Sequence, residues 1–262
     1  MTTRIRVRSL AVTTSVAVAS LLGALAPNAA AEPEPTTTVV APTTTAAPEP
    51  APAPPAPPAP PAPIVLHYLP LTGPDLAKGA SGAEVFLMQI HLVFRGYHVA
   101  DYPAYFGEGT RHALVAFQKQ HGLPRSGVLD GFTRFVLGAS IEKPQPPTRF
   151  NGRGIDVDIN RQIMIVSTNG QVDWIFDVST GKRSTPTPRG SFRIQREING
   201  LRVAKLGRLW RPKYFTGGYA FHGYPSIPNY NASSGCVRMF NPDIDFLWAS
   251  GLAPVGTQVR VF

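Results

Sequence analysis

Apolar residues between positions 74 and 140 recur at helical spacing in three successive runs. The stripes are Val85, Met88, Leu92 and Val93, then Ala113, Leu114 and Phe117, then Phe132, Phe135, Val136 and Leu137. Glycines stand where the runs end, at Gly96, Gly122 and Gly138, and Asp130 is placed to cap the third helix. The pattern therefore predicts a compact bundle of three helices.

The hydrophobic period changes to that of β-strands after about residue 152. Asn169-Gly170 is a strong signal for a two-residue hairpin turn between two alternating runs. The alternating apolar positions are Ile155, Val157, Ile159, Ile163, Ile165, Val172, Trp174, Phe176, Phe192, Ile194, Val259 and Val261. One helix is expected near the end, with Asn241 as its cap, Pro242 at its first position and Gly251 as its stop. The expected fold class is α+β with two domains, the helical bundle being followed by a β-rich domain with a mixed or sandwich-like sheet.

Composition divides the rest of the chain. Arginines at positions 4, 6 and 8 precede an apolar run, and three alanines after the run offer a cleavage site. Residues 1–31 are therefore expected to be a secretory signal. The alternative is an uncleaved membrane anchor. Residues 32–73 are rich in Pro, Ala and Thr and read as an extended, disordered spacer. Residues 141–151 form a shorter linker, which leaves 74–140 and 152–262 as the two expected domains.

The charge of the chain is moderately basic. The formal net charge is +9, and removal of the three signal arginines leaves (25 − 3) − 16 = +6. Export makes an anionic polymer of the cell envelope a more plausible partner than nucleic acid, and membrane contact is expected only through the signal. A charge that serves only solubility is the alternative.

Cys236 is the only cysteine, and His222 lies fourteen positions before it (236 − 222). A lone cysteine in an exported chain has no internal disulfide partner, so packing, intermolecular pairing or chemistry must explain it. The other five histidines all precede His222, which makes His222 the candidate base. An imidazole within reach would lower the pKa of the thiol and later protonate a leaving amine. Gly235 allows a tight turn in which the N–H groups of Gly235 and Cys236 are candidates for an oxyanion site.

Four earlier histidines, at positions 91, 98, 112 and 121, suggest a zinc site at first sight. No acidic residue or cysteine lies among them at recurrent ligand spacing. We therefore expect neither a metal nor another cofactor.

The helical region resembles the type 1 peptidoglycan-binding domain. The matching residues, in order, are Lys78 to Gly82, Val85, Gln89, Leu92, Gly96, Tyr97, Phe106, Gly107, Thr110, Ala113, Phe117, Gln118, Gly122, Leu123, Gly127 and Thr133. The resemblance implies that this domain docks on cell-wall glycopeptide. A helical spacer that binds nothing is the alternative, because no ligand residue can be named from the sequence.

The second domain resembles the L,D-transpeptidase catalytic domain. Its signature is His-Gly followed by Ser-x-Gly-Cys-x-Arg, here His222-Gly223 and Ser233 to Arg238, and positions 185–192 match a Thr-Pro-x-Gly-x-Phe turn. The resemblance implies that a cysteine attacks the carbonyl of an L-centred residue bonded to terminal D-Ala in a tetrapeptide stem. An amine of a neighbouring stem then attacks the thioester to form a 3→3 cross-link. Stem peptides and glycan strands are the implied partners, and carbapenems the implied inhibitors.

Carried over by position, the family roles make Cys236 the nucleophile, His222 the base and acid, and Gly223 the carbonyl that orients the imidazole. Ser233 either hydrogen-bonds within the site or stabilises its loop. Arg238 either anchors a substrate carboxylate or pairs with an acid, Asp243 or Asp245. Three further candidates for substrate binding are Tyr219, Tyr224 and Ser234, of which Ser234 departs from the histidine that many members carry there.

Other readings stay open at this point. A papain-like peptidase places Cys before His, and a sortase-like site would separate the two more widely. The same site could also release D-Ala to water as a carboxypeptidase, or attach a protein to a stem. A wall-binding protein with an inert thiol is the non-enzymatic alternative.

Overall fold

The computed structural model describes residues 70–205 and 207–262. The predicted signal and most of the predicted spacer lie outside these ranges. Within them, no helix combines the length and the apolar character that crossing a membrane requires.

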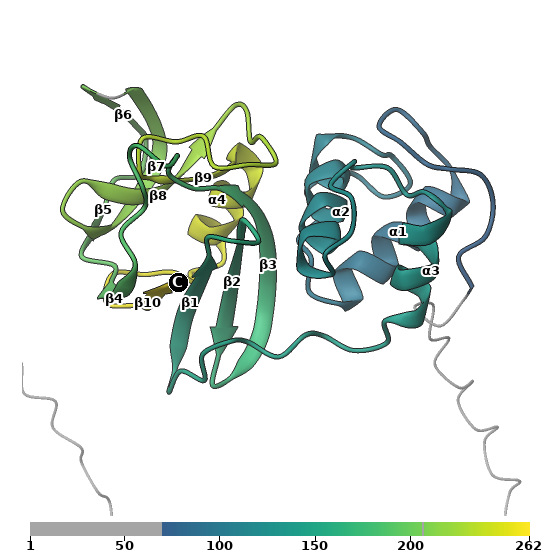
Figure 1. The fold of residues 1–262 in the computed structure, drawn as a ribbon, viewed down its shortest axis with the longest axis horizontal. Helices are drawn as coiled ribbons and strands as arrows, with labels where there is room; N and C mark the ends of the chain where they lie inside the picture. The colour runs from purple at the N-terminus through teal and green to yellow at the C-terminus, as the bar shows by residue number, and fades with distance from the viewer. Residues whose placement is uncertain (1–69, 206) are drawn as a thin grey trace, which may run out of the picture. The chain divides into compact units, whose positions relative to one another are not determined.

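The helical unit contains the expected helices, α1 (Ala83–Phe94), α2 (Glu108–Gln120) and α3 (Gly131–Ala139), which lie together in Figure 1. Asp130 caps α3, because its carboxylate accepts a hydrogen bond from the Thr133 amide at 2.7 Å. Most stripe residues are buried, but Val93, Phe132 and Phe135 are exposed. Helix α3 has only nine residues, and it buries the face of Thr133 and Leu137, from which the two phenylalanines point away.

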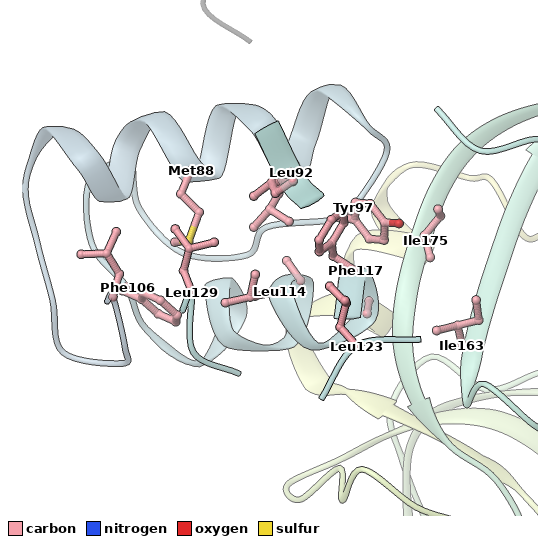
Figure 2. Packing of buried hydrophobic residues seen from close by; sticks show 14 of the residues in the cluster. Met88, Leu92, Tyr97, Phe106, Leu114, Phe117, Leu123, Leu129, Ile163 and Ile175 are labelled. Atoms are coloured by element: carbon pink, nitrogen blue, oxygen red, sulfur yellow. The ribbon is translucent and has the colours of Figure 1, made fainter. Parts of the chain in front are cut away.

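The core of the helical unit continues onto the sheet. Tyr97 and Phe117 meet edge to face, with ring centroids 5.5 Å apart, and Figure 2 shows Tyr97 directed toward Ile175 of the neighbouring strand. The same buried cluster contains four residues of strands β2 and β3, namely Ile163, Ile165, Val172 and Ile175. The two units therefore share this cluster, while a second buried cluster lies within the sheet and α4.

The second unit is a ten-stranded curled sheet with the order β4-β10-β1-β2-β3-β9-β8-β7-β5, and β6 pairs with β7. The pairs β1–β10 and β8–β9 are parallel and the others antiparallel, which makes the sheet mixed as expected. The strands are β1 (Arg153–Asp158), β2 (Ile163–Thr168), β3 (Gln171–Ser179), β4 (Gly190–Arg193), β5 (Arg196–Glu197), β6 (Leu201–Ala204), β7 (Gly207–Thr216), β8 (Tyr219–Tyr224), β9 (Val237–Phe240) and β10 (Gln258–Val261).

Two local signals can be checked directly. The hairpin between β2 and β3 turns at Asn169 and Gly170, whose φ values of 51° and 75° are those of the predicted turn. Helix α4 (Asn241–Ala249) packs against β8 and β9. Its N-cap is Phe240, so the prediction of Asn241 as the cap was wrong. Strand β9 runs directly into the helix, which shifts the start by one residue and places Pro242 within the first turn.

Strand β3 pairs with β2 along one edge, and its other edge is paired by two different parts of the chain. On that edge, β9 pairs with β3 only at Val178 and Ser179. Farther along, the Ile175 amide donates to the Gly96 carbonyl at 2.7 Å, and the His98 amide donates to the Ile175 carbonyl at 3.3 Å. The turn after α1 thus adds hydrogen bonds to a strand of the ten-stranded sheet.

Polar pairs reinforce this interface. Asp177 of β3 is buried between His112, at 2.7 Å, and Lys119, both from α2. Asp243 of α4 pairs with His98 at 2.7 Å. Two of the four histidines that suggested a metal thus contact carboxylates across the interface, and the described residues contain no cluster that could hold a metal ion.

Because the two units share a core, truncation of Ile175 should weaken both at once. Ile175→Ala is expected to lower the free energy of unfolding by about 2–5 kcal/mol, with helical and aromatic signals still lost in one transition. The matched control, Val203→Ala on exposed β6, should change it by less than about 0.5 kcal/mol. Circular dichroism and tryptophan fluorescence during urea unfolding measure this. Two separate transitions in the parent chain would contradict the shared core.

Candidate active site

Of the two predicted chemical residues, His222 lies on β8, and Cys236 directly precedes β9, the strand that pairs in parallel with β8. Strand β8 carries His222, which is in register with Arg238 of β9. Cys236 is two positions before Arg238, so its side chain is on the same face of the sheet as His222. Both line one hollow, with Ser233, Ser234, Tyr224, Arg238 and three residues of β7, Gly207, Arg208 and Leu209.

His222 is held in a defined tautomer. Its Nδ1 lies 2.9 Å from the Gly223 carbonyl oxygen. A carbonyl only accepts hydrogen bonds, so Nδ1 carries the proton and Nε2 has a free lone pair. Burial lowers the pKa of His222 to about 4, and the positive charge of Arg238 acts in the same direction. The imidazole is therefore neutral at pH 7 and able to accept a proton.

Gly223 has a packing reason to be glycine. A Cβ atom there would lie 2.5 Å from Asn241 Oδ1, 2.8 Å from Ile244 Cγ2 and 2.9 Å from Trp210 Cδ1. Any side chain would push α4 or β7 away from β8. The carbonyl that holds His222 is thus fixed by close packing around its own residue.

Cys236 is partly buried and packs against the small cluster of Leu209, Tyr214 and Ala220. Its Sγ lies 3.8 Å from the Gly218 carbonyl oxygen. Burial raises the pKa of the thiol, opposed by the Ala220 amide and the charge of Arg238. The expectation of a lowered thiol pKa is therefore contradicted. The resting pair is a neutral thiol beside a neutral imidazole.

The turn before Cys236 is held from inside. The Ser233 hydroxyl donates to the Cys236 carbonyl and accepts from the Gly235 amide at 3.1 Å. The Thr187 hydroxyl donates to the Gly235 carbonyl at 2.8 Å. Ser233 thus stabilises the loop, the second of its two expected roles. Since the Gly235 N–H is already engaged, the Cys236 N–H remains as the candidate oxyanion donor.

Gly235 also needs its missing side chain. Its φ of 113° is accessible to glycine, and a Cβ would lie 2.4 Å from Tyr219 Cε1. Tyr219 therefore packs on the turn, and it is not among the residues that line the hollow with Cys236.

Arg238 has neither of the acidic partners that the sequence suggested. Asp243 pairs with His98, and Asp245 pairs with Arg211 at 2.9 Å. The Arg238 guanidinium instead lies 4.1 Å from the centre of the Tyr224 ring. The charge of Arg238 thus stays available in the hollow that also contains Ser234 and Tyr224.

Sequence reasoning missed two parts of the site. Arg208 and Leu209 come from β7, and nothing in their local pattern placed that strand beside Cys236. Thr187 was visible within the Thr-Pro-x-Gly-x-Phe turn, but its bond to the Gly235 carbonyl depends on a contact between residues 48 positions apart.

Comparison with known proteins gives two family matches. Residues 152–261 match the L,D-transpeptidase catalytic domain, and residues 81–137 match a peptidoglycan binding domain. The spore cortex-lytic enzyme of Bacillus cereus is 36% identical over 62 residues. That match covers 24% of this chain and 24% of the relative, so only about a quarter of the relative's length is spanned.

Solved structures give a match over a longer range. The L,D-transpeptidase of Xylanimonas cellulosilytica (residues 123–326) is 36% identical, with a TM-score of 0.68, over 74% of this chain and 100% of the solved one. An L,D-transpeptidase 3 of Mycobacterium tuberculosis, solved with a faropenem-derived adduct, is 17% identical with a TM-score of 0.37, over 46% of this chain and 61% of that one. Together with the two domain matches, the Xylanimonas structure shows that this chain belongs to the L,D-transpeptidase family and carries a peptidoglycan binding domain before its catalytic domain.

Proposed function

We propose that this chain is an exported peptidoglycan L,D-transpeptidase that uses Cys236 as its nucleophile and forms 3→3 cross-links through a thioacyl-enzyme. The observation that carries the proposal is the placement of His222 on β8 and of Cys236 directly before β9, with both residues lining a single hollow. The Gly223 carbonyl fixes the His222 tautomer that can act as a base.

Acylation begins from the neutral pair. As the Cys236 sulfur attacks the carbonyl carbon of the L-centred residue, its proton passes to His222 Nε2. The oxyanion accepts a hydrogen bond from the Cys236 amide. Collapse of the tetrahedral intermediate breaks the C–N bond, and the imidazolium gives the proton to the nitrogen of departing D-Ala. The product is a thioester between Cys236 and the stem peptide.

Deacylation reverses these roles. The amine of a neighbouring stem attacks the thioester carbonyl and gives its proton to His222, after which the C–S bond breaks and the thiolate recovers that proton. A new amide bond joins the two stems. Because His222 is neutral at rest, it can serve as base in both half-reactions.

Substrate recognition is assigned to the residues around the thiol. Arg238 is cationic and without an acidic partner in the described part of the chain, so it suits a carboxylate of the donor stem. Tyr224 and Ser234 line the same hollow and supply a ring face and a hydroxyl. Tyr219 acts differently, by supporting the turn at Gly235.

The acceptor and the cellular site belong to the same proposal. The two domain matches support association with the cell wall, and the leader at residues 1–31 supports export. Water as acceptor would make the enzyme an L,D-carboxypeptidase, and a protein amine would make it an attachment enzyme. A wall-binding protein without catalysis would leave the geometry of His222 and Cys236 unused.

Covalent labelling tests the nucleophile. A carbapenem should acylate Cys236, because opening of its ring imitates acyl transfer, and the intact mass should rise by one inhibitor equivalent. Cys236→Ala should abolish the adduct, whereas Val255→Ala, on an exposed loop residue, should retain it. An adduct that persists in Cys236→Ala would place the nucleophile elsewhere.

Donor selection tests the reaction. With purified disaccharide-tetrapeptide, the enzyme should release D-Ala and form a dimer lighter than two monomers by one D-Ala. A pentapeptide ending in D-Ala-D-Ala should not replace it as donor, because its terminal bond joins two D-centred residues. Mass spectrometry of the products decides the outcome: release of D-Ala without dimer would identify a carboxypeptidase.

The protonation states predict an unusual pH profile. Because the His222 pKa is about 4, its base form persists down to that pH, so the acid limb of D-Ala release should lie near pH 4 and not near the ordinary value of about 6.5. The raised thiol pKa should make iodoacetamide alkylation at pH 7 slower than that of a cysteine peptide, with a rate that increases as pH rises. Circular dichroism at each pH checks that the fold persists. An acid limb near 6.5 would show that His222 is not buried as described.

A further inference from the structure

Lys119 has an unusual position for an amine. It lies in the last turn of α2, and its side chain is fully buried against the catalytic sheet. Its ammonium group donates to the Asp177 carboxylate and to the carbonyls of Gln162 and Val178, both at 3.1 Å. These three bonds use all its donors. Burial lowers the pKa of this amine, and Asp177 opposes the shift. A buried ion pair contributes little to stability compared with apolar packing, so its bonds to the two carbonyls call for another explanation.

Gln162, which directly precedes β2, connects Lys119 to the residue that follows β3, Thr180. It is buried and has a φ of 63°, a backbone conformation that residues with side chains rarely adopt. Its side-chain amide donates to Thr180 Oγ1 at 2.6 Å and accepts from the Thr180 amide at 2.7 Å. Lys119 therefore anchors the backbone of a residue whose side chain clamps Thr180 at two points.

Thr180 in turn holds the segment that leads to the nucleophile. Its carbonyl accepts from the amides of Ala232 and Ser233, both at 3.0 Å, and its hydroxyl accepts from the Asn231 side chain at 2.9 Å. Ser233 continues the chain of hydrogen bonds to Cys236 and Gly235. A continuous path of buried polar contacts thus runs from Lys119 to the turn that presents Cys236.

A second contact from the helical unit reaches the same segment. Arg125, between α2 and α3, donates to the Asn229 carbonyl at 2.7 Å, and the Asn229 side chain donates to the Arg125 carbonyl at 2.6 Å. Asn229 lies between β8, which carries His222, and Cys236. The segment is held by the helical unit directly through Arg125 and indirectly through Lys119.

We propose that Lys119 and Arg125 are positioning residues for the nucleophile loop, so that the helical unit is a structural component of the active site as well as a candidate wall-binding domain. This role rests on the proposed function, because it assumes that Cys236 carries out the chemistry. The bonds place the Ser233–Cys236 turn relative to His222, and a misplacement of about 1 Å can cost a factor of about 100 in rate.

The test removes the charges of Lys119 and Asp177 together, and the asparagine oxygen introduced at position 177 can still accept a hydrogen bond from His112. The full-length variant Lys119→Met combined with Asp177→Asn keeps similar volumes and should fold. Relative to the parent chain, kcat for D-Ala release from tetrapeptide is expected to fall by about tenfold or more, with KM changed by less than about twofold. Arg125→Met should lower kcat in the same way by a smaller factor. The matched control is Lys78→Met, which breaks an exposed pair with Glu108 inside the helical unit and should change neither constant.

A second readout separates this proposal from the proposed function. If the loop is displaced, iodoacetamide should alkylate Cys236 several-fold faster in the double variant than in the parent, whether or not either releases D-Ala. If the double variant does not fold, Gln162→Leu removes the next link and should give the same fall in kcat and the same rise in alkylation. Parent-like kcat and alkylation in a folded variant, or a change confined to KM, would overturn the positioning role. Absence of D-Ala release from the parent chain would overturn the transpeptidase assignment instead.

Discussion

The active site depends on one short parallel pairing, that of β8 with β9. In register, it places His222 and Cys236 on the same face of the sheet, which a shift of one residue would undo. Parallel strands cannot be joined by a tight turn, and here 237 − 224 − 1 = 12 residues connect them without a helix or strand. A connection of this length needs support from outside, because it contains little structure of its own.

That need explains why so many polar contacts converge on one segment. Thr180 and Thr187 bind it from the loop between β3 and β4, Ser233 binds it from within, and Arg125 binds it from the helical unit. Each bond is modest alone, but together they fix the backbone that presents the thiol. The arrangement also clarifies the chemistry, since a partly buried cysteine beside a buried imidazole favours two neutral groups at rest. The charge separation then occurs only when a substrate carbonyl is present.

The sequence predicted features that short-range physics decides. The Asn169-Gly170 turn, the Asp130 cap and the three helices depend on neighbouring residues, and the order of His222, Ser233 and Cys236 was visible as a motif. The contacts of Arg238 could not be predicted from the sequence. Both nearby acids pair with residues from distant parts of the chain, and no periodicity indicates that. The protonation of Cys236 was misjudged for the same reason, because the pKa of a thiol depends on burial, which only the assembled sheet creates.

The interface between the helical unit and the sheet also depends on contacts that cannot be predicted from the sequence. Read alone, α2 is an amphipathic helix, and Lys119 near its end looks like an ordinary solvent-exposed lysine favoured by the helix dipole. In the fold, the same residue is enclosed by Asp177, Gln162 and Val178. The shared core of Tyr97 and Ile175 excludes water from this region, which makes each unpaired polar group there costly. The apolar contacts thus hold the units together, while the polar contacts determine the relative placement, and through Thr180 that placement reaches the nucleophile.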